Sequence, residues 1–334
     1  MVWVRRIGLR LASLLAVLLA LTILLFFLQE VAHFDPVAAT LGANASPEAI
    51  AAERARLGLD APVLQRYFIY LGGLLHGDLG TSVRTRHPVA QDIGQFFPAS
   101  AELVLFAYVL ALVLAVAFAA SSVLRWPGGA VGRGVMFLLA AAPSFLLGIV
   151  GVIVFYSRLG WFPGAGRLGD ASQLTDPTGF MTIDALLAGR LDLFGDALHH
   201  LLLPALALAV GPALAIGRVL RSALEATTGA EFIKTAQVKG LGEGAILRRH
   251  VIRNSLPAPL AMAGLYLGYM FAGVVVVERV FTWPGLGLYM FNSLLKADFQ
   301  AVAGSILVLG VIYVTSNAIV DVLQTVADPR ISFD

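Results

Sequence analysis

The chain has 334 residues, of which 58% are hydrophobic and only 13% are charged, and its mean hydropathy is +0.84. Soluble domains carry about 25% charged residues, so this composition excludes an ordinary soluble domain and indicates a protein solvated largely by lipid. The net charge of +2 argues against a nucleic-acid partner, and the lack of cysteine excludes disulfides and cysteine-ligated metal or iron–sulfur sites.

Six apolar runs are each long enough to cross a membrane, which takes roughly 20 helical residues. They are residues 8–28, 98–124, 134–156, 201–220, 256–277 and 302–326. The sequence therefore predicts an all-α polytopic membrane protein with six transmembrane helices and both termini on one side. The first run exceeds the roughly 7–15 apolar residues of a signal peptide, so we expect an uncleaved anchor.

The stretch between the first two runs is too long to be a simple connection. Within it, Ser46 suits a helix cap, Pro47 the first helical position and Glu48 the first turn, which predicts a helix over 46–59. We therefore expect a folded outer lobe. The expected regions are 1–29 with the first transmembrane helix, 30–97 as the lobe, 98–327 as a membrane core that contains a polar stretch at 222–255, and a tail at 328–334.

Lysine and arginine are concentrated in the segments that would share the side of the two termini. They are Arg5, Arg6, Arg10, Arg125, Arg133, Arg218, Arg221, Lys234, Lys239, Arg248, Arg249, Arg253 and Arg330. Loops rich in these residues face the cytoplasm, so we expect both termini and the stretch 222–255 to be cytoplasmic.

The polar stretch begins with a segment of helical pattern, "AEFIKTAQVKG" (230–240). Steps of three and four residues place four side chains at helical spacing: Phe232, Thr235, Ala236 and Lys239. Gly240 is a natural helix end. Small side chains on a short exposed helix would let another protein approach its backbone, and the flanking cations could pair with acids there. The pattern predicts a docking helix; the alternative is a basic loop that only sets the orientation.

One acidic residue and a set of methionine and tyrosine residues in the predicted spans are candidates for a functional role. Glu102 could line a pathway, pair with another helix or reach water at the membrane surface. Met262, Tyr266 and Tyr269 could face a cavity, or pack against lipid or protein. These four are the candidates for a pathway lining.

Other polar side chains predict helix contacts rather than chemistry. Asn317 and Asp321 lie four residues apart on one helix face, which favours helix pairing. His199 and His200 would point about 100° apart on a helix, which disfavours joint chelation, so we expect no metal site.

The polar stretch resembles a signature of known transporters. "TAQVKGL" (235–241) followed by "RHVIRNSLP" (249–257) resembles the cytoplasmic EAA loop of ATP-binding-cassette (ABC) importer permeases, in the form found in the dipeptide, oligopeptide and nickel family. Lys234 stands where the family has the glutamate of E-A-A, so that role could pass to Glu231. Further segments resemble landmarks of the same family in the same order: "NASPEAIAAERARLGLD", "GDLGTS", "RLGWFPGAGR", "LLLPALALAV", "VERVFTWPGLG" and "DPRI".

The resemblance implies a type I importer permease in a bacterial inner membrane. It implies a homologous second permease, two cytoplasmic ATPase subunits that bind ATP and magnesium, and an extracytoplasmic solute-binding protein. Coupling to the ATPases would then fall to Glu231, Phe232, Lys234, Thr235, Ala236, Lys239, Gly240, Leu241, Arg248 and Arg249. Peptides are the favoured substrates, with nickel, glutathione or another small solute as alternatives.

The residues themselves support a division of labour. None of the three lysines, Lys234, Lys239 and Lys296, lies in a G-x-x-x-x-G-K-[ST] motif, so the chain has no P-loop for ATP. We therefore expect no enzyme activity and no cofactor in this chain. A self-contained secondary carrier is the alternative of a different class; an intramembrane protease is disfavoured, because its motifs are missing.

Overall fold

The computed structural model describes residues 2–31, 46–56, 60–123, 126–169, 174 and 177–327, and the side chains of all of these except 2–11, 53, 56 and 321–327. The described residues form helices and no strand; an isolated bridge joins Thr81 to Pro88. The chain divides into two compact units, Met1–Pro98 with Gly285–Val311, and Ala99–Pro284 with Ile312–Asp334.

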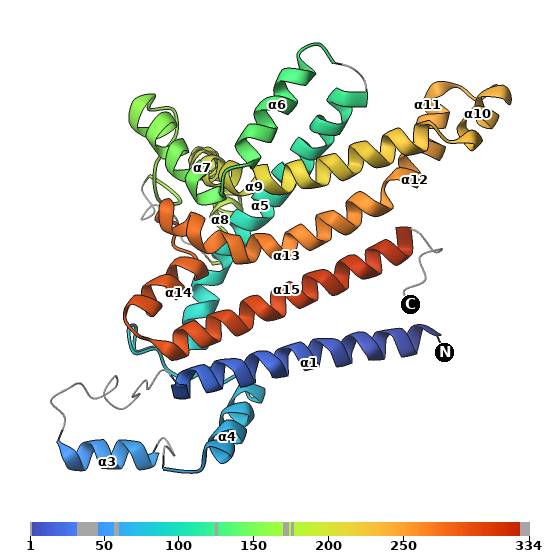
Figure 1. Ribbon diagram of the computed structural model, residues 1–334. Coiled ribbons are helices and arrows are strands. Elements are labelled where there is room, and N and C mark those ends of the chain that lie inside the picture. The colour runs from blue at the N-terminus through green and yellow to red at the C-terminus, as the bar shows by residue number, and fades with distance from the viewer. Residues whose placement is uncertain are drawn as a thin grey trace. The chain divides into compact units, whose positions relative to one another are not determined.

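Five helices within the described ranges are long and apolar enough to span a membrane. They are α1 (Val2–Val31), α5 (Val89–Val123), α9 (Leu191–Thr228), α13 (Pro257–Val280) and α15 (Phe299–Ala327), as Figure 1 shows. The predicted all-α membrane class is confirmed.

The third apolar run is not one straight helix. It forms α6 (Gly129–Ala140) and α7 (Ser144–Gly151), which continues as the π-helix η1 (Val152–Arg158), and the pair is bent by 108°. Pro143 stands at the break with an extended ψ of 148°. Proline has no backbone N–H to donate, and its ring disfavours the helical conformation of the residue before it. The helix is therefore interrupted at this position.

The first unit packs α4 (Val63–Leu75) and the start of α15 against α1. Leu25 is buried against Ala303 and Leu307, and Tyr67 of α4 is hydrogen-bonded to Thr22 at 3.0 Å. The expected capped helix is present as α3 (Pro47–Arg56), whose Ala49 N–H donates to Ser46 Oγ at 3.2 Å. Its expected last residues, 57–59, lie outside the described residues.

A buried polar cluster holds the turn-rich segment after α4 in place. Ser82 donates to Asp298 at 2.5 Å, and Thr85 donates to Asp92 at 2.5 Å. Tyr289 of α14 (Leu286–Leu295) also donates to Asp92, at 2.9 Å. Burial, followed by the hydrogen bond to Asp92, raises the pKa of Tyr289 above its ordinary value, so the phenol stays protonated and remains a donor.

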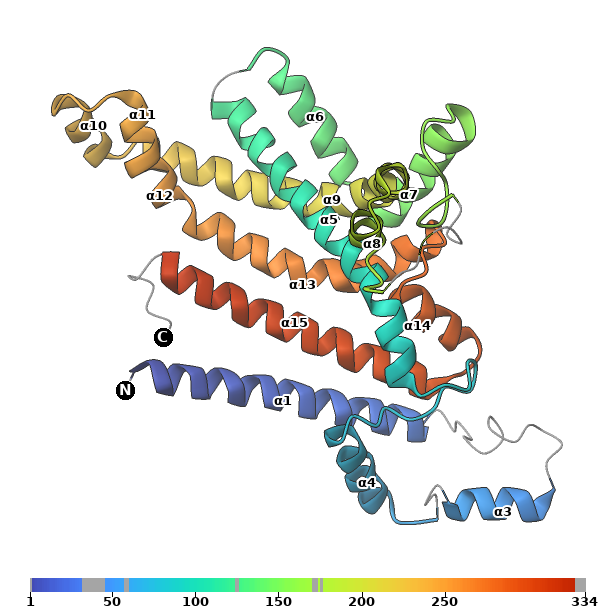
Figure 2. The ribbon, with the colours of Figure 1, turned by 180° about the vertical axis from the view of Figure 1, so that it is seen from behind.

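The second unit is built around α9 and α13, which run side by side in opposite directions in both views (Figure 1 and Figure 2). Glycines permit close helix crossings here. A Cβ on Gly217 of α9 would lie 3.1 Å from the Ala115 carbonyl of α5, and a Cβ on Gly268 of α13 would lie 2.6 Å from the Tyr313 ring of α15.

Shorter helices complete the second unit. They are α8 (Met181–Leu187), α10 (Glu231–Val238), α11 (Glu243–Ile246), the π-helix η3 (Leu247–Ile252) and α12 (Arg253–Ser255). The last four lie at one end of the α9–α13 pair, between the end of α9 and the start of α13 (Figure 1).

Candidate functional site

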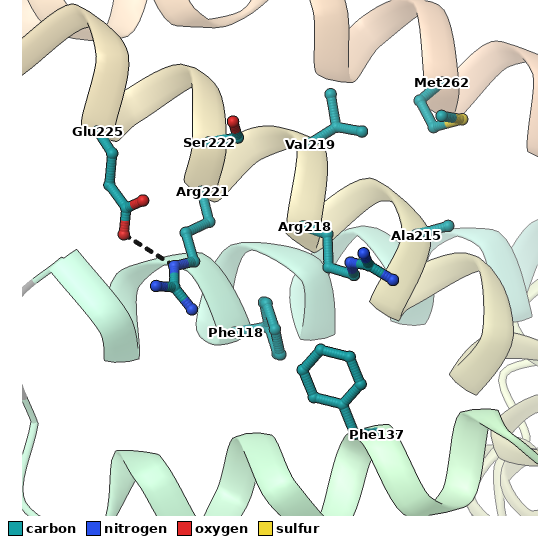
Figure 3. A pocket seen from close by; sticks show the side chains of 9 residues that line it. All are labelled: Phe118, Phe137, Ala215, Arg218, Val219, Arg221, Ser222, Glu225 and Met262. Carbon is teal, nitrogen blue, oxygen red and sulfur yellow. Dashed lines mark hydrogen bonds and ion pairs between the residues drawn. The ribbon is translucent and has the colours of Figure 1, made fainter.

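Two hollows lie along α9 and α13 in the second unit. Both are lined by described residues. The smaller, of about 180 Å³, is lined by Ala142, Ser144, Leu147, Ala207, Leu208, Gly211, Pro212, Tyr266, Tyr269 and Met270. The larger, of about 510 Å³, is lined by Phe118, Phe137, Ala215, Arg218, Val219, Arg221, Ser222, Glu225 and Met262 (Figure 3).

The helical repeat places many of the lining residues of both hollows on one face of each helix. The lining residues of α9 include positions 208, 211, 215, 218 and 222, and those of α13 include 262, 266 and 269. Steps of three and four residues return a helix to the same face. Each helix therefore contributes one continuous stripe, which we call the α9–α13 groove.

Tyrosine rings gather in the smaller hollow. The Tyr266 and Tyr269 rings, which line it, lie 6.1 Å apart between centroids. The Tyr313 ring of α15 lies outside the lining, 6.0 Å from Tyr269. Met262 lines the larger hollow. Three of the four pathway candidates thus line one groove, although their role in a pathway stays a prediction.

Glu102, the fourth candidate, is enclosed instead. Its carboxylate accepts hydrogen bonds from the Thr182 N–H and hydroxyl, both at 2.7 Å, and from Arg167 Nη2 at 2.5 Å. Arg167 also donates to the Gly179 carbonyl at 2.7 Å and stacks over Trp283, 5.6 Å from the ring centroid. These contacts pair Glu102 with Arg167 and with Thr182 of α8 inside the unit, while its role in a pathway stays a prediction.

Sequence reasoning missed two partners in this region. Arg167 closes the "RLGWFPGAGR" segment, and the need of a membrane acid for a counter-ion was the signal that could have found it. Glu278 of α13 is fully buried and accepts a hydrogen bond from Ser100 of α5. Glu278 directly follows the apolar run 256–277, and an acid at the end of such a run marks a position that needs a partner.

At the other end of α9, α10 has one buried face. Ile233 and Ala236 pack against Ile246 of α11 and Val251 of η3. Ala236 thus differs from the expectation of an exposed small side chain, because its size serves packing within the chain. The exposed side includes Phe232, 45% exposed, and Val238, 89% exposed.

Gly240 ends α10 as the sequence predicts. Its φ is +78°, its N–H donates to the Gln237 carbonyl at 2.9 Å, and the Leu241 N–H donates to the Ala236 carbonyl at 3.2 Å. This pair of bonds is the Schellman motif, which favours glycine at the left-handed position. The short helix therefore has a defined end.

Exposed charges surround α10. Lys234 Nζ pairs with Glu231 Oε1 at 2.7 Å. Lys234, which occupies the position of the family's E-A-A glutamate, thus forms an ion pair with Glu231, the residue that could take over its role. Seven of the predicted coupling residues besides Phe232 and Glu231 are exposed: Lys234, Thr235, Lys239, Gly240, Leu241, Arg248 and Arg249. Their contact with an ATPase stays a prediction.

The remaining polar candidates bring no site together. Asn317 is half-buried on α15, and the side chain of Asp321 lies outside the described residues. His199 Nε2 is hydrogen-bonded to the Trp161 carbonyl at 2.7 Å, and His200 Nδ1 to the Asp196 carbonyl at 2.9 Å. The described residues hold no group of three or more metal-ligating side chains.

Comparison with known families covers nearly the whole chain. Residues 3–104 match the N-terminal model of binding-protein-dependent transport system membrane components, and residues 107–333 match the model of the binding-protein-dependent transport system inner membrane component. The chain belongs to this family.

Similar proteins extend over the full length. One is the dipeptide transport system permease protein DppB of Alkalihalophilus pseudofirmus, 33% identical over 97% of this chain and 98% of its own. A second is the probable D,D-dipeptide transport system permease protein DdpB of Escherichia coli, 36% identical over 96% and 95%. The di/tripeptide transport system permease protein DppB of Pseudomonas aeruginosa is 35% identical over 96% and 97%.

Family membership accounts for the several apolar helices of the chain. The chain is a multi-pass membrane component of a transport system that depends on a binding protein. As a permease it is not itself the enzyme of that system.

Proposed function

We propose that the chain is one of two homologous permease subunits of an ATP-driven importer for dipeptides and other short peptides. It forms half of the translocation pathway, and separate ATPase subunits bind ATP and magnesium. The similarity to three peptide permeases over at least 96% of the chain is the observation that carries this proposal.

The α9–α13 groove is this chain's share of the pathway in the proposal. A short peptide presents amide groups and varied side chains, and tyrosine offers an apolar ring together with a hydroxyl. Tyr269 is 53% exposed in the groove and Tyr266 is half-buried. This lining suits short peptides, which share the same backbone amide groups and differ in their side chains.

The segment from α10 to α12 is the proposed contact with the ATPases, on the cytoplasmic side together with both termini. It is tied to α9, because Ser255 Oγ contacts the Ala223 carbonyl at 3.2 Å and Thr227 Oγ1 at 2.9 Å. It leads directly into α13 at Pro257. A push on α10 would therefore move both helices that line the groove, as rigid elements.

Reconstitution tests the proposal. Proteoliposomes should contain this chain with the second permease and the ATPases of its transport system, and receive the binding protein from outside. We expect uptake of labelled dipeptide that requires ATP and every subunit. Uptake of nickel or glutathione in preference to peptide would contradict the substrate, and uptake by this chain alone would make it a self-contained carrier.

A further inference from the structure

The larger hollow of the α9–α13 groove has a charge pattern that peptide transport does not explain. In Figure 3, Arg218 and Arg221 extend from α9 toward Phe118 of α5 and Phe137 of α6. Two guanidinium groups therefore face a space whose walls are mainly apolar.

One of the two cations lacks an acidic partner. Arg221 Nε donates to Glu225 Oε1 at 2.8 Å. Arg218 lies over the Phe137 ring, 5.6 Å from its centroid, and has no carboxylate partner among the described residues. Its guanidinium N–H groups are thus available to an anion, and the hollow carries one more cation than acid.

The hollow lies where α9 changes from apolar to polar. The apolar run 201–220 ends beside it, and the following residues, 221–228, include charged and hydroxyl side chains. That boundary places Arg218 and Arg221 at the level of lipid headgroups. On the orientation in the proposed function, this is the cytoplasmic leaflet, whose anionic lipids attract basic side chains.

The walls distinguish between two kinds of anion. Ser222 is the one neutral polar side chain in the lining. A dipeptide would bring an ammonium group that must compete with Arg221 for Glu225, and an amide group that finds only Ser222 as a neutral partner. Leaving such groups without partners costs free energy. An acyl chain needs none and could lie against Phe118, Phe137 and Met262.

The geometry points to a binding site for an anionic phospholipid in the larger hollow. The phosphate receives the N–H groups of Arg218, with Arg221 beside it, and an acyl chain fills the apolar part between α6 and α9. This site is separate from the tyrosine-lined hollow that the proposed function assigns to peptide.

Lipid titration of the purified full chain tests the site. Native mass spectrometry would measure binding of phosphatidylglycerol and of zwitterionic phosphatidylethanolamine to the delipidated chain in detergent. Arg218→Gln should weaken phosphatidylglycerol binding about fivefold, the effect of one cation near a headgroup, and leave phosphatidylethanolamine binding unchanged. Arg190→Gln is the matched control, because Arg190 is an exposed cation directly before the opposite end of α9.

Three outcomes would overturn the inference. Arg218→Gln could leave phosphatidylglycerol binding at the parental level, or both arginine variants could lower it equally. Alternatively, the dipeptide Ala-Ala could displace phosphatidylglycerol from the parent but not from Arg218→Gln, which would assign the hollow to substrate. Elution of both variants at the parental volume in size-exclusion chromatography confirms that they are folded. Transport is not measured, so failure here leaves the proposed function standing.

Discussion

Arg167 and Glu102 form an ion pair of 2.5 Å between Nη2 and Oε2, with both side chains more than nine-tenths buried. The pair joins the segment after η1 to α5, and Arg167 also stacks on Trp283, whose Nε1 donates to the Ala99 carbonyl at 2.9 Å. Removing only one partner of such a buried pair is destabilising, because the remaining buried charge has neither a partner nor solvent to compensate it.

Removing either partner should destabilise the second unit. We expect Arg167→Gln or Glu102→Gln to lower its free energy of unfolding by about 3 kcal/mol. The double variant should lose clearly less than the sum of the two, because it leaves no uncompensated charge. Thermal unfolding of the four proteins in detergent measures this coupling; strictly additive losses would contradict it.

Tyr289→Phe should weaken the polar cluster of the first unit. It removes the hydrogen bond to buried Asp92, which costs about 1–3 kcal/mol. Tyr269→Phe, which alters a half-exposed phenol, is the control and should stay within about 0.5 kcal/mol of the parent. Denaturation with both proteins in the same detergent measures the difference.

The Tyr289 contribution also has a defined pH dependence. The pKa of this phenol is raised in the folded chain, so its stabilising effect is fully present below the ordinary tyrosine pKa of about 10 and is lost as the pH rises through the raised value. The difference between parent and Tyr289→Phe should therefore be constant from about pH 6 to about pH 9. A difference that disappears within this range would contradict the assigned donor role.

Gly240 and Gly242 should respond differently to the same change. Gly240 has a φ of +78°, where a Cβ is strained, whereas Gly242 has a φ of −65°. Gly240→Ala should cost about 1–2 kcal/mol and increase hydrogen exchange in α10, while Gly242→Ala should not. Equal exchange in the two variants would show that the end of α10 does not depend on the left-handed position.

Patterns of neighbouring residues predicted the apolar helices, a helix cap and a helix end. The apolar runs follow from continuous stretches of sequence, and the Ser46 cap and the stop at Gly240 follow from residue types within one or two helical turns. The partner of Glu102 did not, because Arg167 is 65 residues away along the chain. Likewise the inward side of α10 depends on Ile246 and Val251, which pack against Ala236 only in the folded segment. The break at Pro143 follows from the chemistry of proline, but no local rule predicts its angle of 108°.

We expect the exposed face of α10 to contact an ATPase subunit, and Val238 is suited to a test because its side chain is 89% exposed. ATP-dependent dipeptide uptake should be measured in proteoliposomes that hold the complete transport system. Val238→Asp should lower uptake roughly tenfold or more, because it places a charge in an apolar contact. Val238→Ile, which keeps the contact apolar, should retain it. Uptake by Val238→Asp at the parental rate would show that this face of α10 does not contact the ATPase.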